Sequence, residues 1–173
     1  MAILGYLKST HIIDFLNGFK KKPSSRIFDC LDVQNIVFLK SKNKNEAITE
    51  LVDSLYNSKK IADKDYFLNK IIEREDIVSS GIGMGVAIPH AKLEGLDNFF
   101  IALGIQRKYK IEWDSIDKMP IRIIFLIGGP DKKQNEYLQL LSQLTIVMKD
   151  PDLRRNILKS NHPQDVFDQF VHF

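Results

Sequence analysis

Apolar residues follow two spacings along the chain, and the two alternate from residue 25 onward. Short apolar runs are typical of strands, whereas apolar residues repeated at i, i+3 and i+4 are typical of helices. The predicted strands are 36–39, 86–89, 99–105, 108–113 and 121–127. The predicted helices are 43–57, 63–76, 137–148 and two short ones that begin at Asp150 and at His162, each directly before a proline.

The runs 99–105 and 121–127 are apolar throughout, as expected of central strands that are covered on both faces. The prediction is therefore an α/β fold, a three-layer sandwich in which a mixed β-sheet is flanked by helices on both faces. Residues 25–173 form this domain, because no repeat and no change in composition marks a second one. A turn is expected at Pro130. The following helix is expected to bury Tyr137, Leu138, Leu141, Leu144, Thr145 and Met148.

The first 24 residues have a different character from the rest. Their apolar residues are loosely helical in spacing and are followed by Gly18, a lysine triplet and Pro23. We interpret 1–24 as an N-terminal amphipathic appendage. It is expected to dock on the domain or on a sister chain, which would give a homodimer; binding to another partner is the alternative.

Composition limits the class of protein. The chain has 173 residues, 44% of them hydrophobic and 27% charged, which is typical of one soluble domain whose core needs no disulfide or metal. No apolar run reaches the ~20 residues that cross a bilayer, and Lys8, His11 and Asp14 interrupt any signal peptide. A cytoplasmic protein without direct membrane insertion is expected. The single cysteine, Cys30, is interpreted as a small core residue in a reducing compartment.

Charge and histidine spacing argue against two kinds of site. The 25 Lys+Arg and 22 Asp+Glu residues leave a net charge of +3, which is too small to indicate nucleic-acid binding. The short lysine clusters fall in predicted turns and lack interleaved aromatic residues. The four histidines lie far apart, so no metal site is expected, and no cofactor is expected. Any chemistry must rest on few groups.

A glycine-rich segment leads to one histidine. Gly81, Gly83 and Gly85 precede the predicted strand 86–89 and allow the backbone to approach a ligand closely. A dinucleotide-binding glycine motif instead follows a strand and opens a helix, so nucleotide binding is disfavoured. The ring of Pro89 fixes its backbone angle φ. We therefore expect His90 to emerge at the end of a rigid strand.

A histidine held in this way is suited to phosphoryl transfer. Near neutral pH one imidazole nitrogen is usually unprotonated and can attack phosphorus. The charge on the phosphoryl oxygens then requires positive groups and amide donors, a role for Arg74 and for the glycine-rich backbone. The alternative is a strand-end histidine that is capped by a neighbouring carbonyl group and has no chemical role.

The motifs Arg74-Glu75, Ser80-Gly81-Ile82-Gly83 and Gly85-Val86-Ala87-Ile88-Pro89-His90-Ala91 resemble a known signature. It is that of the enzyme IIA domains of fructose, mannitol and nitrogen-regulatory type in the bacterial phosphoenolpyruvate-dependent phosphotransferase system. The resemblance implies a sheet between helices, and a phosphocarrier in which His90 accepts a phosphoryl group from an HPr-like protein. It places Arg74 beside His90, with Gly81, Gly83, Gly85, Pro89 and Tyr137 around the phosphate site.

The resemblance covers two branches. Asp114 and Asp117, which are interpreted as turn residues, are similar to the Asp-x-x-Asp pattern of the nitrogen-regulatory branch. We therefore expect a regulatory protein whose phosphorylation state controls binding to a partner such as a kinase or transporter. The alternative is a sugar-transport component that passes the phosphoryl group to a cysteine of a IIB domain.

Tyr137 departs from the family pattern. Many members of the family that this chain resembles carry a second histidine at the position of Tyr137, beside the active imidazole. A tyrosine donates a hydrogen bond but does not become cationic near pH 7. It is expected to weaken the site without abolishing it. A binding module that no longer carries phosphate is the alternative, and a tyrosine that merely begins the buried face of its helix is the simplest interpretation.

Overall fold

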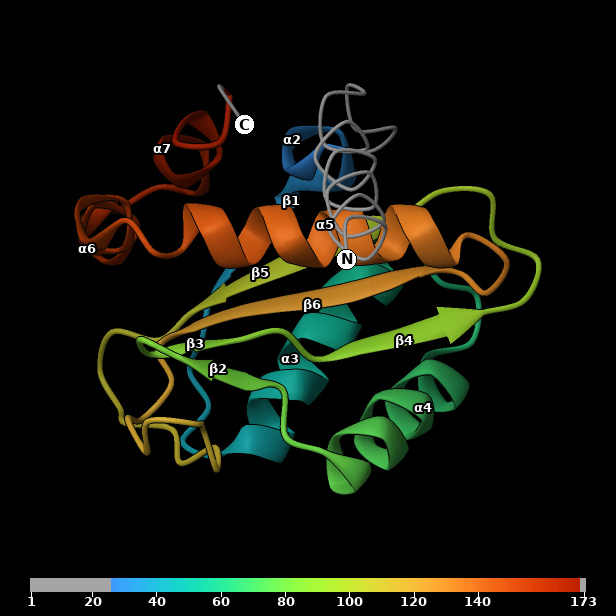
Figure 1. Ribbon diagram of the computed structural model, residues 1–173, viewed down its shortest axis with the longest axis horizontal. Coiled ribbons are helices and arrows are strands. Elements are labelled where there is room, and N and C mark those ends of the chain that lie inside the picture. Colours follow the sequence, from blue (N-terminus) through green and yellow to red (C-terminus); the bar gives the residue numbers. More distant parts are fainter. Residues whose placement is uncertain (1–25, 172–173) are drawn as a thin grey trace, which may run out of the picture.

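A mixed six-stranded sheet is the middle layer of the computed structural model, which describes residues 26–171 (Figure 1). The strand order is β1-β5-β6-β3-β2, and β4 also pairs with β6. β5 and β6 are antiparallel, whereas β1 runs parallel to β5 and both β3 and β4 run parallel to β6. The strands are β1 (Leu31–Phe38), β2 (Gly81–Gly83), β3 (Val86–Ala87), β4 (His90–Leu93), β5 (Phe100–Ile105) and β6 (Ile123–Pro130).

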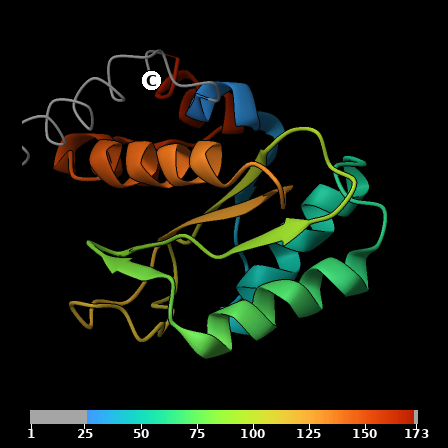
Figure 2. The ribbon, with the colours of Figure 1, turned by 45° about the vertical axis from the view of Figure 1, so that its right-hand side comes forward.

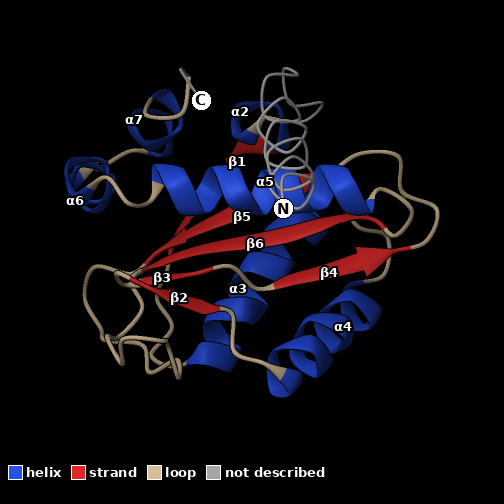
Figure 3. Cartoon of the chain, in the orientation of Figure 1, coloured by secondary structure: helices blue, strands red, loops and turns tan. Residues whose placement is uncertain are grey.

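Helices cover both faces of this sheet, which confirms the predicted three-layer α/β fold (Figure 3). On one face lie α3 (Lys44–Asn57) and α4 (Lys64–Ile77). On the other lie α2 (Ile27–Cys30), α5 (Gln134–Val147), α6 (Pro151–Lys159) and α7 (Pro163–Asp168). Each side has its own apolar core, and the sheet separates the two.

The central strands supply side chains to both cores. Every residue of β5 and β6 is buried, as the unbroken apolar runs predict. Along β6, Phe125 belongs to the core beneath α5, whereas its neighbours Ile124 and Leu126 belong to the core against α3 and α4. This alternation follows from the two-residue period of a strand. The middle of the sheet is therefore dry on both faces.

Helix starts agree with the predicted capping residues. The side chain of Asn43 accepts a hydrogen bond from the backbone amide of Glu46 at 3.0 Å, and that of Asp63 accepts from Tyr66 at 2.9 Å. Asp150 accepts from the amide of Leu153 at 3.3 Å, ahead of the proline that opens α6. Each side chain satisfies an amide that the first helical turn leaves unpaired.

The predicted strand 108–113 is wrong. Within this segment Ile111 forms only an isolated bridge with Ile121. The apolar residues Ile111 and Trp113 are buried because they pack into the core against α3 and α4. No strand edge is open to the segment in the middle of the sheet, since β5 already lies between β1 and β6, and β6 between β5 and β3.

β6 extends three residues beyond the predicted end of its strand, through Pro130, and the turn expected at Pro130 follows directly at residues 131–132. A Cβ atom at Gly128 would lie 2.2 Å from the ring of Phe100, and one at Gly129 would lie 2.0 Å from that of Phe99. The two glycines therefore leave room for aromatic rings against the strand rather than forming a bend.

The buried face of helix α5 overlaps the predicted one but is shifted from it. Tyr137, Leu144 and Met148 are buried as expected, but Leu138 is 52% exposed and Leu140 is fully buried in its place. A leucine-rich helix offers two overlapping apolar stripes, and only contact with the sheet selects one of them.

The remaining expectations concern the ends and the thiol. The predicted appendage, 1–24, lies outside the described residues. Within residues 26–171 no helix has the length and apolar character that a membrane span requires. Cys30 is buried, as predicted for a core residue, and burial raises the pKa of its thiol to about 12.

Candidate functional site

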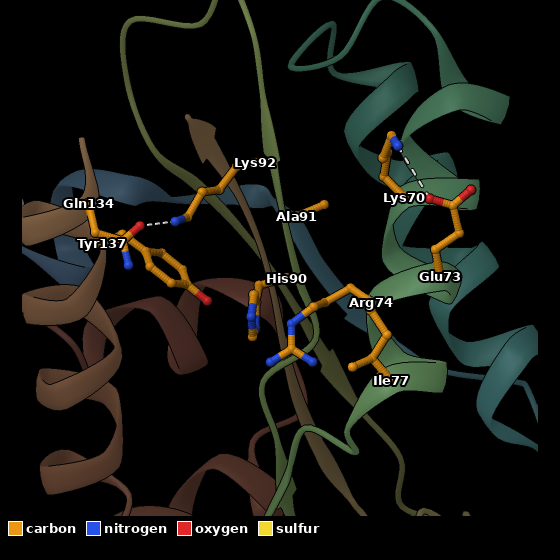
Figure 4. A pocket seen from close by; sticks show the side chains of 9 residues that line it. All are labelled: Lys70, Glu73, Arg74, Ile77, His90, Ala91, Lys92, Gln134 and Tyr137. Atoms are coloured by element: carbon orange, nitrogen blue, oxygen red, sulfur yellow. Dashed lines mark hydrogen bonds and ion pairs between the residues drawn. The ribbon is translucent and has the colours of Figure 1, made fainter. Parts of the chain in front are cut away.

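A pocket of about 490 Å³ lies between α4, β4 and the first turn of α5 (Figure 4). β4 pairs with β6 and lies between α4 and α5 (Figure 2). The pocket brings together three residues that the sequence singles out, Arg74, His90 and Tyr137, from three different elements. Its full lining is Lys70, Glu73, Arg74, Ile77, His90, Ala91, Lys92, Gln134 and Tyr137.

His90 begins a strand rather than ending one, which corrects the sequence-based expectation. β3 and β4 both pair with β6, and this pairing is interrupted between them at Ile88 and Pro89. Pro89 has no amide hydrogen, but its carbonyl oxygen accepts from the amide of Ile127 at 2.9 Å. Pairing resumes at once, with His90 opposite Ile127. The backbone on either side of His90 is therefore tied to the central strand.

One hydrogen bond fixes which nitrogen of His90 is available. The ring Nδ1 lies 2.8 Å from the carbonyl oxygen of Ile88. A carbonyl oxygen only accepts, so Nδ1 carries the proton and donates it to this bond. In the neutral ring Nε2 then holds the lone pair. The carbonyl cap proposed as an alternative to a chemical role is present, and it leaves the second nitrogen free to react.

The surroundings of His90 favour the neutral ring. Burial is the largest effect and lowers the pKa of His90, while the hydrogen bond to Ile88 raises it in part. The positive charge of Arg74 lowers it further, that of Lys92 does so more weakly, and the carboxylate of Glu75 opposes both. The pKa lies below its ordinary value of 6.5. The nucleophilic form is therefore dominant at neutral pH.

Arg74 comes from the last turn of α4 and extends toward His90 (Figure 4). Its Nη1 donates to the carbonyl oxygen of Val78 at 3.1 Å, just beyond the end of the helix. This bond orients the guanidinium group, whose planar fork of N–H donors suits phosphoryl oxygens. The predicted placement of Arg74 beside the imidazole agrees with this geometry.

Glu75 stabilises the part of the site next to Arg74. Glu75 is 5% exposed, and its carboxylate accepts hydrogen bonds from Nε1 of Trp113 at 2.7 Å and from the amide of Ser80 at 3.0 Å. These bonds join the end of α4 to the segment that leads to the hairpin. Sequence reasoning noted Glu75 only as the neighbour of Arg74 and gave it no structural role.

Tyr137 faces His90 from the first turn of α5. The centres of the two rings lie 5.2 Å apart, and the phenolic oxygen is directed toward His90 (Figure 4). The side chain is buried, as the simplest interpretation expects, and burial raises its pKa. No hydrogen-bond partner for the buried hydroxyl group is found among residues 26–171. A donor without an acceptor is unusual in a protein interior.

Two further residues of the pocket, Lys92 and Gln134, make contacts that the sequence does not predict. The ammonium group of Lys92 lies 4.9 Å from the centre of the Tyr137 ring and donates a hydrogen bond to Oε1 of Gln134. The sequence alone favours a solvated charge at Lys92, with the rim of a docking surface as the alternative. A signal was available, since residues two apart on a strand share a face and Lys92 follows His90 by two.

The glycines predicted to frame the site are not among the residues that line the pocket. β2 and β3 form an antiparallel hairpin whose turn holds Gly83, Met84 and Gly85 at φ of 87°, 60° and 74°. A Cβ at Gly81 would lie 2.8 Å from the Cα of Ser115. The glycines therefore permit a tight turn and close packing, and contact with a phosphoryl group stays a prediction.

Asp117 stabilises the turn of this hairpin through hydrogen bonds. Its carboxylate accepts from the amide of Met84 at 2.7 Å and from that of Met119 at 3.0 Å, and these bonds lower its pKa. Asp114 pairs with Lys118 on the surface. Asp117 is thus a turn residue, as predicted, whereas Asp114 lies in the irregular segment just before that turn. Among residues 26–171 no group of three or more histidine, cysteine or acidic side chains is placed to hold a metal ion.

Comparison with known proteins gives a consistent result. A family model described as "Phosphoenolpyruvate-dependent sugar phosphotransferase system, EIIA 2" matches residues 29–172. The chain is 32% identical over 130 residues to the fructose-specific EIIABC component of Bacillus subtilis and 30% identical over 125 residues to the fructose-specific EIIA component of Haloferax volcanii. The aligned regions cover 75% and 72% of this chain.

These relatives differ in length. The match spans 20% of the Bacillus protein but 80% of the Haloferax protein. Among solved structures, the nitrogen regulatory protein IIA-Ntr from Neisseria meningitidis superposes with a TM-score of 0.77, covering 84% of this chain and 99% of that one. The sequence identity in that superposition is 23%, so the likeness concerns the fold.

Proposed function

The chain belongs to the EIIA 2 family of the phosphoenolpyruvate-dependent sugar phosphotransferase system, and on this premise we propose that it carries a phosphoryl group on Nε2 of His90. The single observation that carries the proposal is the bond from Nδ1 to the carbonyl oxygen of Ile88, because it leaves Nε2 as the nitrogen with a lone pair. His90 is half-buried and lines a pocket that a donor can enter.

The transfer needs no proton movement. The lone pair of Nε2 attacks the phosphorus of a donor phosphohistidine, and a new N–P bond forms as the N–P bond of the donor breaks. The donor imidazole keeps the electron pair of the broken bond, and the PO₃ unit passes to His90. While positive charge develops on the His90 ring, the bond from Nδ1–H to the carbonyl oxygen of Ile88 strengthens and stabilises it.

Arg74 and Tyr137 meet the phosphoryl oxygens in this proposal. The guanidinium group of Arg74 offsets their negative charge, and the unpaired hydroxyl of Tyr137 donates a hydrogen bond to one of them. A neutral donor contributes roughly 0.5–1.5 kcal/mol, less than a charged one. The pocket therefore holds the group with one strong and one weaker donor.

We infer that the donor is an HPr-like phosphocarrier and that the chain is of the nitrogen-regulatory type, whose phosphorylation state controls binding to a kinase or transporter. The spacing of Asp114 and Asp117 supports this branch. The alternative, transfer to the cysteine of a IIB domain during sugar uptake, is supported by the fructose-specific relatives. Transfer of label to a IIB domain distinguishes the two.

Phosphorylation of the purified chain tests the proposed function. Incubation with labelled phosphoenolpyruvate, enzyme I and HPr is expected to give an acid-labile label on the native chain and none on His90→Ala. His162→Ala is a matched control, because His162 starts α7 far along the chain from the pocket and should keep full label. Undiminished label on His90→Ala, or no label on the native chain, would reject the proposal.

A pure binding module is the second candidate, and the observation in its favour is the neutral tyrosine at position 137. It predicts that partner capture from lysate is the same for the native chain and for His90→Asp, which imitates added negative charge. The phosphocarrier predicts that the two recover different partners. The second candidate also predicts no label in the phosphorylation assay.

A further inference from the structure

Lys92 has a defined place in the pocket that the proposed transfer step does not explain. Its ammonium group lies over the ring of Tyr137, 4.9 Å from the ring centre, and donates a hydrogen bond to Oε1 of Gln134. Gln134 and Tyr137 are three residues apart in the first turn of α5, so they share a face of that helix. One lysine of β4 thus holds the start of α5 at two points.

The same strand carries His90. Lys92 follows it by two residues, so both side chains leave β4 on the same face, toward α5. Tyr137 lies between them, with His90 near its hydroxyl end and the ammonium group of Lys92 beside Gln134 (Figure 4). The ring is therefore held by an imidazole on one side and a cation on the other.

The hydroxyl of Tyr137 is ready for an acceptor. It is buried, directed toward His90 and without a hydrogen-bond partner in the described part of the chain. An oxygen atom attached to His90 would satisfy it. A cation over an aromatic ring draws electron density toward itself, which makes the O–H of that ring a better donor. The charge that a tyrosine lacks is thus supplied next to it.

We propose that Lys92 is a positioning residue for phosphoryl transfer: together with Gln134 it fixes Tyr137 so that the hydroxyl meets a phosphoryl oxygen on His90. The inference rests on the proposed function, and it assigns a role to a residue outside the transfer step itself. Figure 4 shows Arg74 on one side of His90 and the Lys92–Tyr137 pair on the other.

A double-mutant cycle in the full chain tests this role. Lys92→Met keeps the apolar stem and removes the charge, whereas Lys92→Arg keeps the charge. The readout is the equilibrium of phosphoryl exchange with phosphorylated HPr. Lys92→Met is expected to shift it away from this chain by about threefold to tenfold, the range of one cation–π contact. Lys92→Arg should stay near the native value. Lys149→Met, which replaces an exposed lysine two residues beyond the end of α5, should also keep the native value.

The cycle is completed with Tyr137→Phe. Because Lys92 acts through Tyr137, the double variant Lys92→Met, Tyr137→Phe is expected to shift the exchange equilibrium little more than Tyr137→Phe alone does. Titration of His90 by NMR supplies a readout that a structural role would not change. Loss of the Lys92 charge should raise the pKa of His90, and Lys92→Arg should leave it unchanged.

The outcomes separate this inference from the proposed function. If the native chain takes no label from HPr, both fail. If the native chain is labelled but Lys92→Met keeps the native exchange equilibrium, only the role of Lys92 fails. The same conclusion follows if Lys92→Met is equally harmful with and without Tyr137→Phe, since the two residues would then act independently. Thermal unfolding of each variant checks that the fold is retained.

Discussion

The imidazole of His90 is held neutral by burial while its Nδ1–H is bound to the carbonyl oxygen of Ile88. These two features act in opposite directions on the pKa, and burial is the larger. The result is a ring that presents one unprotonated nitrogen at neutral pH and has a hydrogen-bond acceptor behind it for the charged state. Both requirements of a phosphoryl acceptor are met by a single side chain and one backbone carbonyl.

Acid should weaken both activity and stability through His90. Its pKa in the folded chain is lowered, so between that pKa and about 6.5 the unfolded chain binds more protons than the folded one. Stability therefore rises with pH in this window and is lost as pH falls through it. Denaturant unfolding at several pH values measures this effect. As pH falls, His90→Asn is expected to lose less free energy of unfolding than the native chain does. An equal loss in both would contradict this account.

Arg74 should not tolerate replacement by lysine. Arg74→Lys keeps the positive charge but loses the planar fork, which donates to the carbonyl oxygen of Val78 and, in the proposed transfer, also to a phosphoryl oxygen. Loss of one charge-assisted hydrogen bond, roughly 1.5–3 kcal/mol, corresponds to about a tenfold to hundredfold fall in phosphoryl acceptance. The rate of label uptake from HPr measures it. Arg155→Lys, on the surface of α6, is the control and should keep the native rate.

At this scale the sequence identifies the reactive groups better than their supports. Arg74, His90 and Tyr137 are found because each belongs to a motif or departs from one. Lys92, Gln134 and Glu75 are missed, since a lysine, a glutamine and a glutamate are usually solvated. Only the fold brings Gln134, 42 positions along the chain, to the ammonium group of Lys92.

Among the elements, the pair β3 and β4 decides where His90 lies. Both strands pair with β6, and Pro89 separates them by removing one amide donor. His90 thus starts a new strand with its backbone paired and its side chain between α4 and α5. The hairpin of β2 and β3 leads into this arrangement and depends on a turn with three residues at positive φ.

The hairpin turn should be sensitive to a single methyl group. At Gly83 a Cβ would face a positive φ of 87° and lie 3.0 Å from Oδ2 of Asp117. Gly95 also has a positive φ, 77°, but a Cβ there would meet nothing within 4 Å. Gly83→Ala is expected to lower the free energy of unfolding by about 1–3 kcal/mol, and more than Gly95→Ala does. Denaturant unfolding measures both, and equal losses would contradict the packing described for Asp117.

The observed face of α5 makes a second prediction for this scale. Leu138, which the apolar pattern predicts to be buried, is 52% exposed, and Leu140, which the predicted face does not include, is fully buried. Leu140→Ala is expected to cost about 2–5 kcal/mol of unfolding free energy, whereas Leu138→Ala should change it by about 0.5 kcal/mol or less. A larger effect at Leu138 would mean that the helix packs on its other face.

Local signals predict elements well where the chemistry is local. The capping side chains of Asn43, Asp63 and Asp150 mark their helices, because each bonds an amide two or three residues away. The four-residue strand β4 escaped, since its pairing with β6 joins residues almost 40 positions apart. The same limit explains the false strand at 108–113, whose apolar residues are buried without a ladder.

In the whole molecule, two apolar cores hold one sheet between them, and the pocket lies where the layers meet at β4. The unbroken apolar runs of β5 and β6 predict this architecture, because strands buried on both faces require helices on both sides. The apolar pattern does not predict the convergence of α4, β4 and α5, which only the resemblance to the family implies. That convergence places a guanidinium, an imidazole and a phenol, from positions 74, 90 and 137, around one space.

The most direct test of the central claim is the position of the phosphorus–nitrogen bond. NMR of the chain phosphorylated by HPr, with histidine nitrogens labelled, reports which ring nitrogen couples to phosphorus. The account predicts coupling at Nε2 of His90, with Nδ1 still protonated. A bond at Nδ1, or at any histidine other than His90, would contradict it.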